Sequence, residues 1–447
     1  MLSEVSSPEE ASSHQGRVSS VFRRFWTRAS SAPAAPLTVL ALVSVVSVGS
    51  RVLWLASPRL LIFDEHYYVN AARVILGLEA SPFYAKSTPG KDPNREHPPL
   101  GKLALAGSIR AFGDGPVGWR LPSVAFGSLA ILAMYGLVRS VGGSRWLGVG
   151  ASSLMAADTL FFVQGRVGML DIFVLTFMLL GSALYLGGRP IPAGVVLGIG
   201  ASTKLVGLYA LFPLLLFEVL RLVFRRFPPP PRGRPTIGAR LRAFMLCAVA
   251  ALVSYLGLLY ALDLAVTDYK NPLAHTGYMI SFHERLAVKG GHTPASPPWS
   301  WLVNREPLFY LKVKLSPGES ARGPSISVRP QRTPLFFQGV MNPAIIGLGV
   351  PALAAACYSV WRRRDPASLL AVAWFLGTWL PFLAMAWRLP DRPLYLFYML
   401  VVLPGVYLAV AQFFSGRYLS RIYTVGYAVA VVLGFWYEFP FKTWGGI

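Results

Sequence analysis

Two adjacent acidic residues, Asp64 and Glu65, follow the first long apolar run of the chain in the sequence Phe-Asp-Glu-His-Tyr-Tyr. At the end of a membrane span an ionised carboxylate is costly to desolvate, so a functional role is the default hypothesis. A carboxylate held at such a boundary can serve as the acid or base in a proton transfer. The same pair could instead be a solvated loop cap, and the surrounding sequence must decide between the two.

The composition indicates that this acidic pair belongs to a polytopic membrane protein. Hydrophobic residues make up 54% of the 447 residues and charged residues only 14%, which is unlike a soluble globular chain. Because a helix needs about 20 apolar residues to cross a bilayer, we predict an all-α fold with about 11 transmembrane helices. The candidate runs are 36–56, 117–138, 146–162, 169–186, 191–202, 206–222, 241–264, 343–360, 368–387, 395–414 and 422–436.

The basic residues predict the orientation of these spans, since arginine and lysine favour cytoplasmic segments. They cluster at every second connection, at Arg17–Arg28, Arg139–Arg145, Arg189, Arg221–Arg242, Arg362–Arg364 and Arg417–Arg421. This places the N-terminus in the cytoplasm and both the C-terminus and Asp64-Glu65 outside, in the cell membrane. The net charge of +22 is then mainly a topology signal and an attraction to anionic membrane lipids. The sequence offers no basic soluble domain that could bind nucleic acid, so we do not expect that function.

The chain divides into a polar tail and one membrane domain. Residues 1–35 lack apolar periodicity and predict a disordered cytoplasmic tail, with no signal peptide, ahead of a domain spanning 36–447. Two outside loops, at about 57–116 and 265–342, are long enough to hold a site. Within the first, the apolar spacing predicts amphipathic surface helices after the acidic pair and over 100–112. Cys247 and Cys357 lie within predicted spans, so no disulfide framework is implied.

Several ordered motifs, taken together, resemble the protein O-mannosyltransferases, glycosyltransferase family 39 of the GT-C superfamily. The resemblance covers most of the chain. Its segments are Arg51, Asp64-Glu65, Glu96-His-Pro-Pro-Leu-Gly-Lys102, Arg120, Gln164-Gly-Arg-Val-Gly-Met-Leu-Asp171, Ser202-Thr-Lys-Leu-Val-Gly-Leu208, Ser281-Phe-His-Glu-Arg-Leu286, His292, Ser296-Pro-Pro-Trp-Ser-Trp301 and Arg392 with Tyr395-Leu-Phe-Tyr398. Residues 291–294 depart from the family's usual His-Pro-Tyr. The second outside loop is too short for the β-trefoil insertion of eukaryotic members, which favours a bacterial-type enzyme.

The resemblance implies transfer of mannose from a polyprenyl-phosphate mannose to Ser/Thr hydroxyls of secreted or membrane proteins. A hydroxyl is a weak nucleophile at neutral pH, so a carboxylate must take its proton, and Asp64 is the candidate base. Glu65 points elsewhere, because adjacent helical residues do not share a face. We expect it to orient the acceptor, the loop or a sugar hydroxyl. A single base suits direct displacement with inversion.

The departing lipid phosphate needs cations near the membrane surface. Arg51, Arg120, Arg166 and Lys204 are the candidates for binding this donor phosphate. For Arg51 the simpler alternative is an arginine at a helix end that reaches toward the interface, whereas Arg120 matches the family and lies beside the proposed site. Lys204 interrupts an apolar stretch, which is costly unless it faces a partner or water. Asp171 is available to pair with either Arg166 or Lys204, and the sequence does not choose between them.

The remaining candidates are expected to support the site or contact substrate. They are His97, Lys102, Asp171, His283, His292, Trp299, Arg392 and Tyr398. The histidines lack close ligand spacing, so we predict no metal site and no required cofactor, although related oligosaccharyltransferases use a divalent cation. For Trp299 a role as an interfacial anchor is favoured over one as a platform for a sugar.

Two other functions stay open at this point. One is a GT-C enzyme that moves another lipid-linked sugar to a lipid or glycan, such as an aminoarabinose-type lipid A transferase. The other is a transporter, although transporter sites favour the bilayer midplane and repeated halves, whereas the polar motifs here gather outside. The expected partners of the leading hypothesis are the lipid-linked donor, a polypeptide acceptor, membrane lipids and the secretion translocon.

Overall fold

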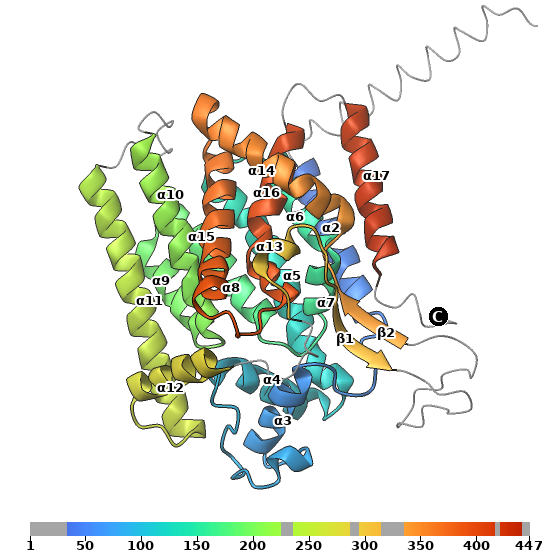
Figure 1. Ribbon diagram of the computed structural model, residues 1–447, viewed down its shortest axis with the longest axis vertical. Helices are drawn as coiled ribbons and strands as arrows, with labels where there is room; N and C mark the ends of the chain where they lie inside the picture. Colours follow the sequence, from blue (N-terminus) through green and yellow to red (C-terminus); the bar gives the residue numbers. More distant parts are fainter. Residues whose placement is uncertain (1–33, 225–235, 287–294, 314–334, 416–420, 440–447) are drawn as a thin grey trace, which may run out of the picture.

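The structure is a computed structural model that describes residues 34–224, 236–286, 295–313, 335–415 and 421–439. Long helices run roughly side by side, and shorter elements gather at one end of the bundle (Figure 1). The helices of the bundle are α2 (Ala35–Val52), α5 (Pro116–Ser140), α6 (Arg145–Ala156), α7 (Thr159–Gln164), α8 (Asp171–Leu186), α9 (Pro190–Ala201), α10 (Leu211–Val223), α11 (Ile237–Val266), α14 (Pro343–Arg363), α15 (Pro366–Arg388), α16 (Leu403–Ser415) and α17 (Arg421–Tyr437).

Every predicted apolar run is helical over most of its length. Among the described residues, six helical stretches are long and apolar enough to cross a membrane, at 35–52, 116–140, 205–223, 237–266, 343–363 and 366–388. The run predicted over 146–162 is divided into α6 and α7, because the side chain of Asp158 accepts a hydrogen bond from the amide of Phe161 and starts a new helix. The number of helices that actually cross the membrane stays a prediction.

Two runs begin as tighter 3₁₀ turns before they become α-helical. These are η2 (Leu205–Ala210), which precedes α10, and η3 (Leu396–Val401), which precedes α16. A short 3₁₀ segment presents its side chains differently from a regular helix. The predicted site residue Lys204 directly precedes η2, and Tyr398 lies within η3.

Small residues let two of the long helices approach closely. A Cβ atom added at Gly198 of α9 would lie 2.5 Å from the carbonyl oxygen of Ala251 in α11. At Gly194, one turn earlier, it would lie 2.2 Å from the carbonyl oxygen of Cys247. Glycine at such positions is typical of helix packing within membranes. The close contact holds α11 against the bundle and so fixes the place of the helix that follows it.

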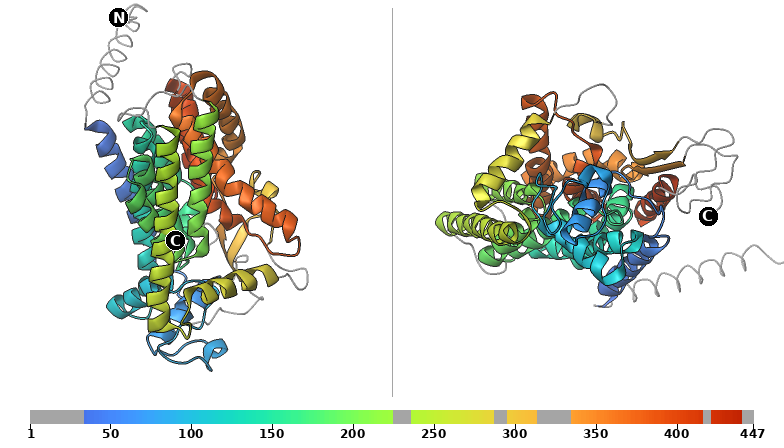
Figure 2. Two further views of the ribbon diagram at one scale, coloured as in Figure 1. Left: turned by 90° about the vertical axis from the view of Figure 1, so that its left-hand side faces the viewer. Right: turned by 90° about the horizontal axis from the view of Figure 1, so that it is seen from below.

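The elements at the end of the bundle position the predicted site. They are α3 (Glu65–Ile75), η1 (Pro82–Tyr84), α4 (Leu100–Phe112), α12 (Pro272–Arg285) and α13 (Pro298–Trp301). Seen from below, α3 and α4 lie over the end of the bundle (Figure 2). The two amphipathic helices expected in the first outside loop are therefore present, the second with the predicted bounds.

A short antiparallel pair completes the described structure. Strand β1 (Leu308–Val313) pairs with β2 (Leu335–Gly339), and the register shifts between Phe309 and Leu311. Tyr310 lies at this irregularity, and its ring packs 5.1 Å from that of Phe63, just before the acidic pair. The hairpin thus supports the turn that carries Asp64.

Candidate active site

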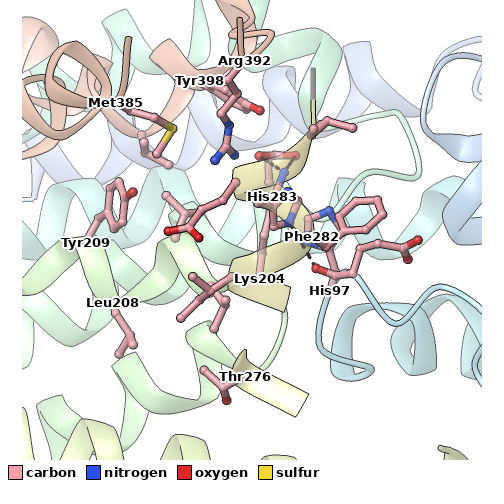
Figure 3. A pocket seen from close by; sticks show the side chains of 18 of the residues that line it. His97, Lys204, Leu208, Tyr209, Thr276, Phe282, His283, Met385, Arg392 and Tyr398 are labelled. Atoms are coloured by element: carbon pink, nitrogen blue, oxygen red, sulfur yellow. Dashed lines mark hydrogen bonds and ion pairs between the residues drawn. The ribbon is translucent and has the colours of Figure 1, made fainter. Parts of the chain in front are cut away.

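A cavity of about 1360 Å³ lies between the end elements and the long helices α10, α11 and α15. Part of its lining is apolar and comes from the long helices and η2, including Leu208, Phe212, Leu252, Leu256, Pro381 and Met385. Its polar residues include Asp64, Glu96, His97, Asp171, Lys204 and Arg392. Figure 3 shows His97, Lys204, His283, Arg392 and Tyr398 around this polar region. A cavity of this kind can hold a molecule with a long apolar tail and a charged head.

Asp64 enters the cavity from a fixed turn. The preceding residue, Phe63, has a φ of 47°, which is uncommon for a bulky side chain and needs support from its surroundings. That support comes from the rings of Tyr310 and Phe397, whose centroids lie 5.1 and 5.8 Å from that of Phe63. Burial raises the pKa of Asp64 to about 6, with Lys204 opposing the shift and Asp171 adding to it. Asp64 is therefore a carboxylate that can accept a proton near neutral pH.

Glu65 turns away from the cavity into the protein. Its carboxylate is fully buried and pairs with Arg120 through two contacts, at 2.8 Å and 2.9 Å. It also accepts hydrogen bonds from the amides of Ile62, at 3.0 Å, and Gly168, at 2.8 Å. Of the three partners expected for Glu65, the structure favours the loop, and a direct catalytic role does not fit this position.

Arg120 also differs from its expected role. All five of its N–H groups have acceptors: two in the Glu65 carboxylate, and three in backbone carbonyls of the loop after α2. Those carbonyls belong to Leu55, Pro58 and Leu60, at 3.1, 2.8 and 3.1 Å. A guanidinium has five donors, so Arg120 has none left for a donor phosphate. We correct the prediction: Arg120 holds the loop that carries Asp64.

Arg51 and Arg166 likewise lie outside the cavity lining. Arg51 donates to the carbonyl of Ser47 at 3.2 Å, and its guanidinium lies 4.7 Å from the ring centroid of Phe161. Arg166 donates to the carbonyl of Trp54 at 2.8 Å and lies 5.6 Å from the ring of Phe162. Both side chains are buried. Neither residue lines the cavity, and their contact with the donor phosphate stays a prediction.

Lys204 is the member of the predicted cation set that lines the cavity. Its ammonium group lies 2.9 and 3.1 Å from the two carboxylate oxygens of Asp171. The structure thus settles the choice left open by the sequence, because Asp171 pairs with Lys204. The ammonium also lies 5.4 Å from the ring of Phe397 and 6.0 Å from that of Tyr398. An ammonium group has three donors, so one can still face a ligand.

Arg392 and Tyr398 add a second cation and an aromatic wall to the cavity. The Tyr398 ring stacks on Phe382 at 5.2 Å. Arg392 points toward the polar region in Figure 3 and interacts with the Tyr398 hydroxyl. Lys204 and Arg392 are thus two cations that could contact a phosphate, in a lining that also carries Asp64, Glu96 and Asp171.

The two described histidines of the predicted site meet in the cavity. The rings of His97 and His283 lie 5.0 Å apart. Burial lowers the pKa of His97 well below its usual value and that of His283 to about 4, with Lys204 and Arg392 acting in the same direction. Both are therefore neutral at pH 7. Within the described ranges no group of three or more His, Cys, Asp or Glu side chains could hold a metal ion.

Three other predicted site residues are not among those that line the cavity. Lys102 is buried and pairs with Asp92 at 2.5 Å, so it supports the loop and does not line the cavity. Trp299 is 60% exposed and also lies outside the lining, whereas Trp301 is buried and packs near Tyr398. His292 falls outside the described residues.

Several cavity residues were missed by the sequence interpretation. Glu96 stands directly before His97 in a recognised motif, and this adjacency was a usable signal. Tyr209 and Arg388 also line the cavity. Arg388 closes an apolar span on the side predicted to be outside, where arginine is disfavoured, and that exception could have marked it.

The sequence of this chain resembles those of known protein mannosyltransferases. Residues 112–229 match the family model described as dolichyl-phosphate-mannose-protein mannosyltransferase. A polyprenol-phosphate-mannose–protein mannosyltransferase of Mycolicibacterium smegmatis is 26% identical, over 90% of this chain and 88% of its own length. The protein of that name in Corynebacterium glutamicum is 26% identical over 86% and 82% of the two chains.

Solved structures give the same fold. A chain of the Saccharomyces cerevisiae protein O-mannosyltransferase Pmt1-Pmt2 complex bound to the sugar donor superposes with a TM-score of 0.68 at 11% identity, covering 92% of this chain and 90% of that one. ArnT from Cupriavidus metallidurans bound to undecaprenyl phosphate gives 0.52 at 20% identity, covering 90% of this chain and 64% of that one. The chain is therefore a multi-pass membrane protein with the GT-C glycosyltransferase fold, and its resemblance to the protein O-mannosyltransferase family is confirmed.

Proposed function

We propose that this protein transfers mannose from a polyprenyl-phosphate mannose to serine or threonine hydroxyls of proteins. The observation that carries the proposal is the position of Asp64, whose carboxylate lines the same cavity as Lys204 and Arg392. A base and phosphate-binding cations thus share one space with an apolar wall. The relatives whose names contain this activity align with most of the chain.

The cavity suits a lipid-linked sugar phosphate. Leu208, Phe212 and Met385 provide an apolar surface for prenyl units, where each buried methylene contributes about 0.8 kcal/mol. Lys204 and Arg392 lie where the negatively charged head would bind. Charge-assisted hydrogen bonds to phosphate are stronger than neutral ones, so these two cations would fix the donor's phosphate.

The reaction we propose is a single displacement. The acceptor hydroxyl loses its proton to Asp64 while its oxygen forms a bond to the anomeric carbon of mannose. The bond from that carbon to the phosphate oxygen breaks, and its electron pair leaves with the lipid phosphate. Lys204 and Arg392 stabilise the charge that develops there. Glu65 is buried against Arg120 and Asp171 is paired with Lys204, so we assign Asp64 the role of base and no neighbouring carboxylate that of nucleophile, which favours inversion.

This scheme assigns charge stabilisation to side chains, so we propose that no metal ion is required. Lys204 and Arg392 already supply positive charge at the polar region of the cavity. Measuring transfer by metal-free protein with and without added Mg²⁺, Mn²⁺ or Ca²⁺ tests the proposal. Equal rates are expected, and a strict dependence on one ion would contradict it.

We further propose that the site faces the outside of the cell membrane, with a cytoplasmic N-terminus and an outside C-terminus. The support is the alternation of arginine clusters along the sequence. An acceptor would then meet the site as it emerges from the membrane, which would place the enzyme near the secretion translocon. Cysteine labelling of intact cells with an impermeant reagent, at an introduced Phe83→Cys and at an introduced cysteine at the 139–145 connection, should label only the former.

The deciding experiment supplies membranes containing the protein with radiolabelled polyprenyl-phosphate mannose and a Ser/Thr peptide. Mannosylated peptide is the expected product. The second candidate is transfer to a lipid or glycan, because the fold alone, which is shared with ArnT bound to undecaprenyl phosphate, does not specify the acceptor. Label that enters lipid and never peptide would replace the leading proposal with this alternative, and label that crosses the membrane unchanged would favour a transporter.

A further inference from the structure

The segment 94–97, which brings Glu96 and His97 to the cavity, is held by side chains. It contains no helix or strand. Four consecutive backbone carbonyls instead accept hydrogen bonds from three basic side chains, which we call the carbonyl cradle. The bonds run from Lys102 Nζ to the carbonyls of Asn94 and His97 (2.8 Å for His97), from His275 Nε2 to that of Arg95 at 2.9 Å, and from His283 Nε2 to that of Glu96 at 3.2 Å.

His275 differs from the other histidine of the cradle in what faces its second nitrogen. Its Nδ1 lies 2.8 and 2.9 Å from the two carboxylate oxygens of Asp263. His275 and Asp263 are both 0% exposed, so water does not compete for these contacts. The ring therefore sits between a carboxylate on α11 and a backbone carbonyl of the outside loop.

Each ring nitrogen of His275 faces an oxygen that can accept a hydrogen bond. A carbonyl oxygen can only accept a hydrogen bond, and an ionised carboxylate can only accept as well. The ring satisfies both partners only when both nitrogens carry hydrogen, as in the imidazolium form. Asp263 compensates the resulting charge, as a buried cation requires. Asp263 thus stands beside His275 as Asp92 stands beside Lys102.

The groups around His275 come from each element packed against it. Asp263 faces it from α11, and Tyr269 stacks on the ring at a centroid distance of 4.2 Å. The Asp92–Lys102 pair of the outside loop and α4 lies near enough for the charge of His275 to act on Asp92. His283, about two turns further along α12, is neutral because burial lowers its pKa to about 4.

Loss of the proton would change only one end of the ring. A neutral imidazole keeps Nδ1–H toward the Asp263 carboxylate, because that hydrogen bond is charge-assisted. Nε2 then presents a lone pair to the carbonyl oxygen of Arg95, and two acceptors face each other. Since an unmade buried hydrogen bond is costly, the 94–97 segment would move away from α12.

We propose that His275 is a positioning residue that acts as a doubly protonated imidazolium and holds Glu96 and His97 at the wall of the cavity. That these two side chains contact the sugar donor rests on the proposed function. Deprotonation of His275 releases the carbonyl of Arg95 and weakens donor binding, so the affinity for the donor falls at alkaline pH. His275 itself touches neither donor nor acceptor.

The protonation state can be measured without any activity. The chain has six histidines, so ¹⁵N-histidine labelling of the full-length protein in detergent gives a small spectrum, and His275→Gln assigns the resonance. We expect two N–H groups on His275 at pH 7. A single N–H with a free ring nitrogen would overturn the proposal. Should His275→Gln not fold, Asp263→Asn serves instead, and we expect it to remove one N–H at pH 7.

The positioning role is tested by the pH dependence of the donor KM. In the wild type, KM should rise about tenfold from pH 7 to the alkaline limit, the effect of one lost hydrogen bond to a charged group. In His275→Gln, KM should be raised already at pH 7 and stay flat, with kcat little changed. His66→Gln, an exposed histidine of α3, should follow the wild type. A His275→Gln curve parallel to the wild type would refute the inference, whereas a wild type without mannose transfer would refute only the proposed function.

Discussion

Glu65 and Arg120 form a bidentate ion pair, with 2.8 Å from Nε to Oε1 and 2.9 Å from Nη2 to Oε2, and neither side chain lines the cavity. The pair joins the start of α3 to α5, and Arg120 also holds three carbonyls of the loop between α2 and α3. The loop that ends in Asp64 is therefore fastened from the side opposite the cavity.

Breaking this pair should destabilise the protein. Glu65→Gln leaves the Arg120 guanidinium buried without its counter-charge, which costs about 3–5 kcal/mol for buried pairs. Thermal unfolding in detergent should show a lower Tm for Glu65→Gln and for Arg120→Gln. The double variant should lose less than the sum of the two. Additive losses would mean that the two side chains are not coupled.

Replacement of Asp64 should remove catalysis and spare binding. Asp64→Asn keeps the shape of the side chain but cannot accept the proton, and general-base catalysis contributes about 10²–10⁴ in rate. We expect kcat to fall by about that factor while the Kd for the donor, measured by lipid-analogue titration, stays within about twofold. Asp114→Asn is the matched control, because that carboxylate pairs with Arg73 at 2.9 Å and does not line the cavity. Normal turnover in Asp64→Asn would exclude it as base.

The acid limb of the activity profile should report Asp64. Its pKa is raised to about 6, mainly by burial, and only the ionised form accepts a proton. The value of kcat/KM should therefore rise with pH through about 6 and reach its maximum near pH 7, below the alkaline range in which the donor KM is expected to rise. Two variants should move this limb in opposite directions: Asp171→Asn to lower pH, because Asp171 raises the pKa of Asp64, and Lys204→Met to higher pH, because Lys204 lowers it. Shifts of the same sign would contradict the assignment.

The ion pair of Lys204 with Asp171 should regulate how tightly phosphate is held. Lys204→Met removes a cation, and we expect the donor KM to rise about tenfold, the usual effect of one charge-assisted hydrogen bond. Asp171→Asn frees the ammonium group from a competing carboxylate at 2.9 Å. It should lower the inhibition constant of free polyprenyl phosphate, measured in the transfer assay. An unchanged constant in both variants would place the phosphate elsewhere.

The sequence predicted the frame of the molecule better than the direction of its side chains. Apolar runs predicted each long helix, because a run of about 20 apolar residues is typical of a helix that crosses a membrane. The proline pair before Leu100 predicted the start of α4, because proline is favoured at the beginning of a helix. These signals are local, and the structure follows them.

The sequence did not indicate the packing of two arginines whose partners lie far away in sequence. Arg120 is satisfied by Glu65 and by carbonyls 60 to 65 residues earlier, and Arg51 lies against Phe161 of α7. In an apolar helix, the local sequence around an arginine that faces a ligand is the same as that around an arginine that faces the protein interior. His275 and Asp263 belong to no recognised motif, so nothing local indicated that they meet.

The carbonyl cradle has a consequence for redesign of the enzyme. Its four hydrogen bonds are made to backbone oxygens, which every amino acid carries. The backbone of 94–97 can therefore stay in place while the cavity-facing side chains of Glu96 and His97 are exchanged. A library confined to these two positions would sample different sugar head groups on an unchanged scaffold.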